Sequence, residues 1–244
     1  MPGPELGASV LPLAFEGVTF ETSGTRLLYD VSFRLEFGPV SVILGPNGAG
    51  KSLTLRLCDG LLSPTAGRVR WLGPGAQRAG SARAMVFQRP VLLRRSTAAN
   101  VDYGLRLRKV PRAERRARTA RVLGAVGLGE LTGRPARRLS VGQQQRLALA
   151  RAWALEPQVL FLDEPAAALD PGACRDLENA VRRVRDDGTK IVMTTHDLAQ
   201  ARRMADEVLY LDRGRLLEQT PAAEFFEQPR STEAKAFLQG DIAP

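Results

Sequence analysis

Residues 45–52, with the sequence GPNGAGKS, constrain the fold of this chain more than any other stretch. They follow an apolar run, residues 39–44, and precede a helix-like segment that starts at Leu53. They match the pattern G-x-x-x-x-G-K-[ST], in which glycines let successive backbone N–H groups converge on an anion at a helix N-terminus. A Gly-rich turn alone can match by chance, but here the strand before and the helix after are also expected. The stretch therefore predicts a phosphate cradle for a nucleoside triphosphate, with Lys51 reaching the β- and γ-phosphates and Ser52 a ligand of Mg²⁺.

A second apolar run, residues 158–162, ends in two carboxylates, Asp163 and Glu164. Its composition is typical of a fully buried parallel strand. A core strand with a solvated acidic end is the plain alternative. However, Mg²⁺ beside a triphosphate needs a carboxylate, and an attacking water needs a group that orients or deprotonates it. We assign Asp163 to the metal and Glu164 to the water.

A third apolar run, residues 190–195, ends at His196, which is the single histidine of the chain. A lone histidine is usually structural. Open parallel α/β sheets, however, gather ligand groups at the carboxyl ends of their strands, and all three runs end in a chemically useful residue. The shared position predicts that His196 is an active-site residue.

Residues 139–143 read LSVGQ and precede a strong helix former, so Ser140 could simply cap that helix. With these residues the chain resembles the nucleotide-binding subunits of ATP-binding cassette (ABC) transporters, whose LSGGQ signature stands before the Asp-Glu strand. Gln88 occupies the position of that family's Q-loop, and residues 168–170 (ALD) that of its D-loop. The resemblance covers nearly the whole chain, and five motifs occur in the family's order.

The resemblance implies an α/β fold: a P-loop NTPase domain of the ABC ATPase type, with an N-terminal antiparallel β subdomain and an inserted α-helical subdomain. We expect the nucleotide-binding domain at residues 13–220, the helical subdomain at about 89–155, and a short helical tail at 221–244. The alternation of residues 13–35 independently predicts antiparallel strands, and residues 207–218 predict a hairpin.

The resemblance also implies ATP hydrolysis with Mg²⁺ at a site shared by two head-to-tail subunits. Glu164 and His196 are the expected catalytic residues, and the expected metal ligands are Ser52, Gln88 and Asp163. The signature of the second subunit would close each site over the phosphates. The residues expected to bind ATP are Gly45, Pro46, Asn47, Gly48, Ala49, Gly50, Lys51, Ser52, Leu53, Gln88, Ser140, Gly142 and Gln143.

Three positions depart from the family pattern. Val141 stands where the signature usually has glycine, and a valine there would be strained if the position needs a positive φ. Ala167 replaces the serine that usually begins the D-loop, which removes a hydroxyl that could link the two sites across the dimer. The aromatic residue that stacks on adenine aligns with Thr22, and Phe20 or Tyr29 are the possible substitutes.

Composition excludes several other classes of protein. No apolar run approaches the roughly 20 residues of a membrane-spanning helix, and residues 1–6 lack the basic start of a signal peptide, so we expect a cytoplasmic location. Cys58 and Cys174 form no paired motif and are expected to be reduced core or half-buried thiols. The net charge of +9 is almost wholly arginine. The dense stretch 112–121 has no interleaved aromatic residues, so we expect a solvated helix face and no nucleic-acid binding, although an anionic lipid or acidic partner loop would also fit.

The expected partners are a second copy of this chain, integral membrane permease subunits and, indirectly, a solute-binding protein. Such a subunit would work at the cytoplasmic face of the membrane. Because no membrane domain is fused to the cassette, an importer is favoured over an exporter, and non-transport ABC ATPases carry insertions that are not seen here. Residues 87–96 and 100–105, where the family's permease docks, look most like cassettes of tungstate and phosphate importers. We therefore expect an oxyanion importer, tungstate ahead of phosphate, with amino acids as the alternative.

Overall fold

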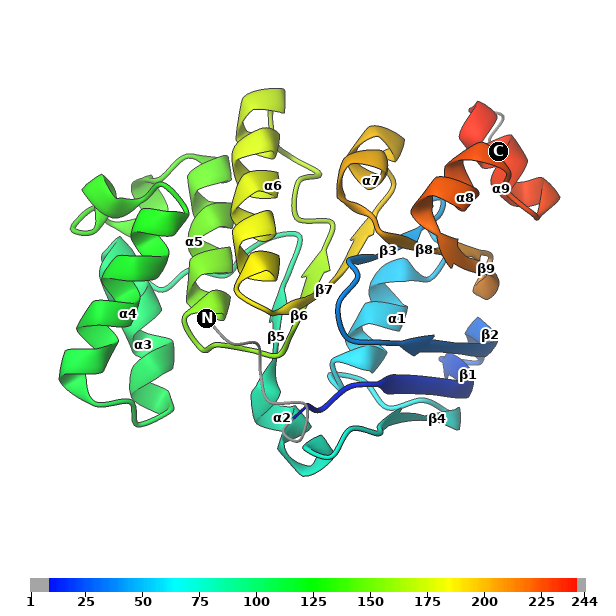
Figure 1. Ribbon diagram of the computed structural model, residues 1–244, viewed down its shortest axis with the longest axis horizontal. Helices are drawn as coiled ribbons and strands as arrows, with labels where there is room; N and C mark the ends of the chain where they lie inside the picture. The colour runs from blue at the N-terminus through cyan, green and yellow to red at the C-terminus, as the bar shows by residue number, and fades with distance from the viewer. Residues whose placement is uncertain (1–8, 241–244) are drawn as a thin grey trace.

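The computed structural model of the protein describes residues 9–240 (Figure 1). Residues 1–6, on which the signal-peptide expectation rests, and residues 241–244 of the expected tail lie outside this range. The described chain forms a six-stranded sheet in the order β5-β6-β7-β3-β8-β9 and a three-stranded sheet in the order β2-β1-β4. This is the mixed α/β architecture that the sequence predicted.

The six-stranded sheet carries the three predicted apolar runs side by side. They are β3 (Ser41–Leu44), β6 (Val159–Asp163) and β7 (Lys190–Thr195), and every residue of the three strands is buried. Such complete burial is typical of parallel strands covered on both faces. β7 pairs in parallel with both β3 and β6, so their carboxyl ends meet at one edge of the sheet, as predicted. β5 (Arg83–Val86) and β8 (Glu207–Asp212) extend the parallel order, and β9 (Arg215–Pro221) closes the predicted hairpin with β8.

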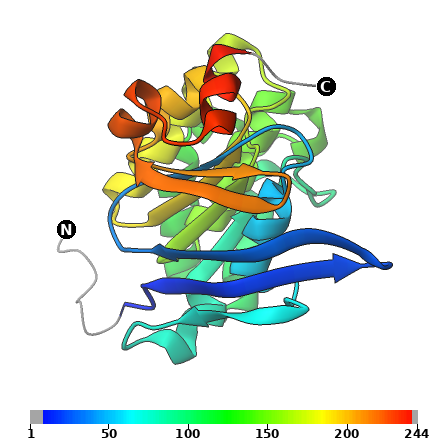
Figure 2. The same ribbon diagram turned by 90° about the vertical axis from the view of Figure 1, so that its right-hand side faces the viewer.

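The three-stranded sheet is antiparallel, which confirms the reading of residues 13–35. β1 (Leu13–Thr22) pairs with β2 (Thr25–Leu35) on one side and with β4 (Ala66–Trp71) on the other. The rings of Phe15 and Phe33 stack with centroids 4.6 Å apart on its inner face. Helix α1 (Lys51–Cys58) lies between the two sheets, and its buried leucines join the core that both sheets share (Figures 1 and 2).

The chain between β5 and β6 is largely helical and lies on the far side of the large sheet from the small one (Figure 1). It contains α3 (Thr97–Leu107), α4 (Arg112–Ala125), α5 (Val141–Trp153) and the short turns η3 (Gly129–Leu131) and η4 (Ala136–Arg138). These elements fall within residues 89–155. The domain boundaries themselves stay a prediction. Helix α5 packs against α6 (Pro171–Asp186), the helix that follows β6.

Five shorter helices complete the described chain. η2 (Ala76–Arg78) and α2 (Ala79–Ala82) precede β5, and α7 (Leu198–Met204) follows β7. After β9 come α8 (Ala222–Glu227) and α9 (Thr232–Gln239), which pack on the sheet through contacts of Phe225 and Phe237 with the ring of Tyr210. Within residues 9–240 no helix is long and apolar enough to cross a membrane. Cys58 is buried and Cys174 half-buried, both as free thiols, as predicted.

Candidate active site

Two glycines of the phosphate loop have backbone angles that a residue with a side chain would not adopt without strain. Gly45 has φ 152° and Gly50 has φ 98°, in the region where a side chain is strained. A Cβ at Gly45 would lie 2.0 Å from the carbonyl oxygen of Leu211, and one at Gly50 would lie 2.7 Å from the side chain of Leu28. Gly50 caps α1, which begins at Lys51. The loop therefore runs from the end of β3 into a helix N-terminus, the geometry that binds anions.

Lys51 is almost fully buried, with 5% of its surface exposed. Its Nζ donates hydrogen bonds to the carbonyl oxygens of Gly45 and Pro46, both at 2.9 Å, and lies 3.5 Å from Oε1 of Glu164. Burial lowers the pKa of Lys51, and the charge of Glu164 opposes that effect. The ammonium group thus lies inside the loop, with a carboxylate as its counter-ion.

Asp163 accepts two short hydrogen bonds on one oxygen. Oγ of Ser52 donates to its Oδ1 at 2.6 Å, and Oγ1 of Thr194 donates to the same atom at 2.9 Å. The guanidinium of Arg56 lies 3.8 Å from Oδ2. The carboxylate is 3% exposed, so these neighbours hold its orientation. A hydroxyl and a carboxylate in contact are hard oxygen donors of the kind that Mg²⁺ prefers.

Glu164 and His196 lie in contact, as the shared strand edge predicted. Nδ1 of His196 is 3.2 Å from Oε2 of Glu164, whose side chain is 13% exposed, whereas that of His196 is 47% exposed. Glu164 has φ 42°, a left-handed conformation that is uncommon for a residue other than glycine. Its backbone N–H donates to Oγ1 of Thr194 at 2.9 Å. Because strained backbone clusters at functional sites, this angle supports a role for Glu164 beyond packing.

Thr194 is the residue that the sequence analysis missed. Its buried hydroxyl donates to Asp163 and accepts from the backbone of Glu164, so it fixes both carboxylates relative to β7. The only local signal was a threonine two positions before His196, and it was weak, because Thr195 beside it is also polar.

The signature residues are stabilised within their own helix, and no hydrogen bond or ion pair of the described residues joins them to the phosphate loop of the same chain. Ser140 caps α5: its Oγ accepts from the Gln143 N–H at 3.3 Å, and Oε1 of Gln143 accepts from the Ser140 N–H at 3.0 Å. Gly142 is required by packing, because a Cβ there would lie 2.7 Å from Cβ of Ala173 on α6. In Figure 1, β6 and β7 lie between α5 and α1.

Gln88 is exposed two residues after the end of β5, and its carbonyl accepts a hydrogen bond of 2.8 Å from the side chain of Gln145 on α5. No hydrogen bond joins its own side chain to Ser52 or Asp163. A cavity of about 410 Å³ lies beside it, with walls that include Met85, Phe87, Val91, Leu93, Tyr103 and Arg151.

The structure shows the surroundings of the three positions that depart from the family pattern. Val141 is the first residue of α5, has no positive φ, and is 56% exposed, so the strain considered for a valine at this position is absent. Ala167 is exposed in the turn after Glu164. Thr22 is exposed at the end of β1, and Phe20 packs against the core. The guanidinium carbons of Arg26 and Arg215 lie 5.8 and 5.0 Å from the ring centre of Tyr29.

Lys51, Ser52, Asp163, Glu164 and His196 thus lie around one edge of the large sheet. The family model described as "ABC transporter" matches residues 28–167, more than half of the chain. The chain belongs to the ABC transporter family. It is an ATP-binding domain of that family, an ATPase.

Two relatives and one solved structure show how far the similarity of this ABC domain extends. It is 37% identical to the sulfate/thiosulfate import ATP-binding protein CysA of Thermosynechococcus vestitus, over 93% of this chain and 69% of that protein. It is 38% identical to the methionine import ATP-binding protein MetN of Caulobacter vibrioides, over 92% and 71%. The structure of cbiO1 from Clostridium perfringens, part of the ABC transporter complex cbiONQ, superposes with a TM-score of 0.79 at 30% identity and covers 93% of this chain and 94% of that one.

Proposed function

We propose that this ABC ATPase powers a membrane importer. The observation that carries the proposal is the contact of Lys51 and His196 with Glu164, next to the Ser52–Asp163 pair, at the carboxyl edge of the large sheet. These groups are the ones that binding and hydrolysis of a nucleoside triphosphate require. The import direction is supported by the names of the relatives, CysA and MetN.

Each residue of the edge has one role in the proposal. Lys51 and the backbone N–H groups of Gly45 and of residues 47–53 bind the β- and γ-phosphates. Ser52 and Asp163 fit Mg²⁺ through their oxygen atoms, with Gln88 as a further ligand, and the ion would neutralise charge on the phosphates. Glu164 orients and deprotonates the attacking water. His196, half-exposed beside Glu164, contacts the γ-phosphate and that water.

A second copy of the chain is proposed to complete each site, because the signature at the start of α5 is exposed and remote from the phosphate loop of its own chain. The test mixes two variants, Lys51→Ala and Ser140→Arg. If sites are shared, each variant alone is inactive, and an equal mixture regains about a quarter of wild-type sites, since half of random dimers hold one intact site of two. An active Ser140→Arg variant, or a mixture without regained activity, would contradict the shared site.

The permease is proposed to dock at the cavity beside Gln88, at the cytoplasmic face of the membrane. Val91 lies on the cavity wall and is 76% exposed, so its side chain presents apolar surface that a docked partner would cover. Val91→Asp should abolish co-purification with the permease subunit, whereas Phe37→Asp, at an exposed apolar residue elsewhere, should not. Equal loss of co-purification in both variants, or no loss in either, would exclude this docking site.

The cargo is proposed to be an oxyanion, tungstate ahead of phosphate, with an amino acid as the alternative. Residues 87–96 and 100–105 support the oxyanion, and the relatives include importers of both kinds. The experiment identifies the solute-binding protein of the same system and titrates it calorimetrically. Tight binding of an amino acid with no response to tungstate or phosphate would refute the oxyanion assignment without touching the ATPase.

A further inference from the structure

The positive charge of this protein is concentrated in one part of the fold. Residues 89–155 hold sixteen arginines and lysines and three acids, a formal charge of +13, whereas the whole chain carries +9. The remaining residues therefore carry −4. This part contains the helices α3, α4 and α5, so the excess lies on the helical layer and not on the sheets.

Three of the arginines of α4 are neutralised locally, which corrects the reading of residues 112–121 as one solvated face. Arg115 lies 2.7 Å from Asp102 on α3. Arg118 pairs with Glu114 and, at 2.7 Å, with Glu156, and Arg121 lies 3.0 Å from the same Glu156. These side chains hold α4 against its neighbours and are not the source of the excess charge.

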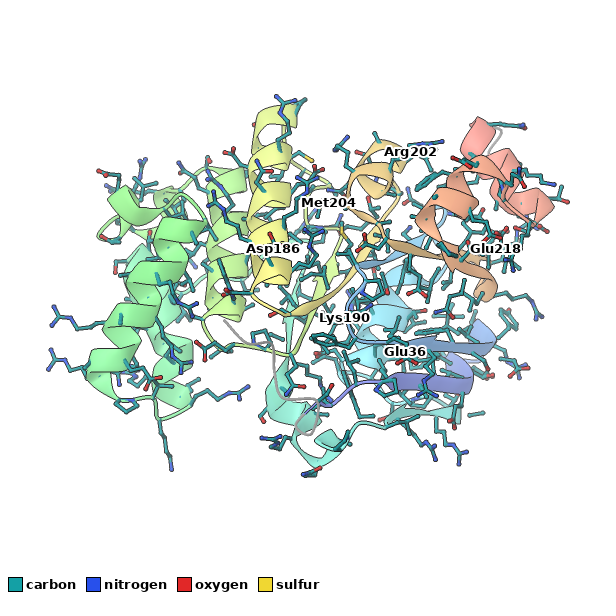
Figure 3. All side chains as sticks on the ribbon, viewed as in Figure 1. Glu36, Asp186, Lys190, Arg202, Met204 and Glu218 are labelled. Carbon is teal, nitrogen blue, oxygen red and sulfur yellow. The ribbon has the colours of Figure 1, made fainter. Side chains whose placement is uncertain are left out.

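Five basic residues near the turn between α3 and α4 have no acidic partner, and one of them, Arg108, donates to the carbonyl oxygen of Ser81 at 2.9 Å. The other four, Arg106, Lys109, Arg112 and Arg116, are exposed, and none forms an ion pair with any residue that the structure describes. Arg112 and Arg116 share a face of α4, since residues four apart on a helix are neighbours. Between these four charges lies Leu107, which is 65% exposed. We call Leu107 and these four basic residues the basic corner. Nitrogen-tipped side chains project into solvent from the outer end of the helical layer in Figure 3.

The basic corner lies away from the surface that the second copy of the chain would cover. Thr97 at the start of α3 donates its N–H to the carbonyl of Arg134, in the segment that leads to the signature. The basic corner lies at the other end of α3, which has 11 residues and is about 16 Å long. A ligand of the corner therefore leaves Ser140 free.

We propose that the basic corner binds an anionic lipid surface. A cluster of unpaired cations is attracted to anionic headgroups by about 1 kcal/mol for each Lys or Arg, and an exposed leucine among them adds apolar burial at the headgroup boundary. Nucleic acid fits less well, because the nearest ring, Tyr103, lies under the guanidinium of Arg106 and on the cavity wall and offers no stacking face. The inference goes beyond the importer function and does not require it.

The experiment measures sedimentation of the full chain with vesicles, without permease. Wild-type protein should bind vesicles of equal parts phosphatidylglycerol and phosphatidylcholine at low salt, and should not bind phosphatidylcholine alone. Lys109→Gln/Arg112→Gln should weaken partitioning roughly 20- to 30-fold, from two cations at about 1 kcal/mol each. Leu107→Ser should weaken it about fivefold. The matched control is Arg137→Gln/Arg138→Gln, which removes the same charge from exposed residues near the signature.

Four results would overturn the inference. Equal weakening by the two double variants would show that net charge, not the corner, drives binding. Equal binding to neutral vesicles, or no binding of the wild type to anionic ones, would exclude electrostatic recognition of lipid. Tighter binding to duplex DNA than to anionic vesicles, lost in the Lys109→Gln/Arg112→Gln variant, would assign the corner to nucleic acid instead. Thermal unfolding of each variant shows whether it is folded.

Discussion

Glu164→Gln should separate ATP binding from hydrolysis. The carboxylate lies 3.5 Å from Lys51 and 3.2 Å from His196, and glutamine preserves its shape while removing its basicity. Loss of a positioned general base costs typically 10²–10⁴-fold in rate, which is about 3–5 kcal/mol of barrier. The expected result is hydrolysis slowed by that factor, with ATP still bound and an ATP-loaded dimer accumulating.

The same substitution should also lower the stability of the ligand-free protein. Lys51 keeps its two carbonyl partners at 2.9 Å but loses its nearest counter-ion while remaining buried. Removing one hydrogen-bonded charge partner costs about 1–3 kcal/mol, and a bound triphosphate would replace the missing negative charge. Glu164→Gln should therefore melt earlier than wild type without ATP and recover when Mg²⁺ and ATP are added.

The assays are steady-state phosphate release at saturating ATP, ATP binding by equilibrium titration, and thermal unfolding with and without nucleotide. Glu227→Gln, an equivalent change on α8, is the control and should alter none of the three. Turnover of Glu164→Gln within about threefold of wild type would refute the role as base, since that is about 0.7 kcal/mol of barrier. Melting unchanged by the mutation would show that the Lys51 contact contributes no net stability.

Four further predictions concern the signature and two buried charges. Gly142→Ala should lower the free energy of unfolding by about 1–3 kcal/mol in urea melts, because its Cβ would overlap Ala173. Val141→Gly should change the rate of phosphate release less than about tenfold, because Val141 is exposed and has no positive φ. Burial lowers the pKa of Lys190 (labelled in Figure 3) from 10.5 to about 8. Between these two pH values the unfolded chain binds the proton more tightly than the folded protein does, so the free energy of unfolding should rise with pH relative to Lys190→Met. Identical dependence of stability on pH in the two proteins would contradict the pKa shift. Burial raises the pKa of Asp59 to about 6 from 3.8, so its contribution to stability is lost as pH rises through that window, and Asp59→Asn should be the more stable protein at pH 7 but not at pH 4.

The site residues at the strand ends could be predicted because each depends on a short, continuous piece of sequence. An apolar run that is buried on both faces indicates a parallel strand, and parallel strands bring their carboxyl ends together. Hence Asp163, Glu164 and His196 could be placed beside the phosphate loop before any contact was known. Register inside the sheet, however, depends on long-range pairing, so the bond from Thr194 to Asp163 had no local signal strong enough to predict it.

Other features depend on contacts that no local pattern encodes. β4 joins the edge of the small sheet by pairing with β1 across some fifty residues of chain, and Arg118 and Arg121 find Glu156 only because α4 packs near the end of α5. The φ of Glu164 is likewise imposed by its surroundings, where Thr194 holds the backbone N–H and Ala167 donates to the carbonyl. Propensity alone would have placed glycine there.

Val141 illustrates why a departure from a motif need not be a loss of function. The capping box uses the N–H of Gln143, and the helix uses that of Gln144, so the N–H groups of Val141 and Gly142 at the start of α5 have no partner inside the helix. Oγ of Ser140 only accepts in the box, which leaves its hydroxyl hydrogen free to donate. Three donors thus stand at the positive end of a 13-residue helix. A valine side chain removes none of them, because the donors belong to the backbone and to Ser140, and the exposed branch at position 141 changes only the shape that the phosphates of a second chain would meet.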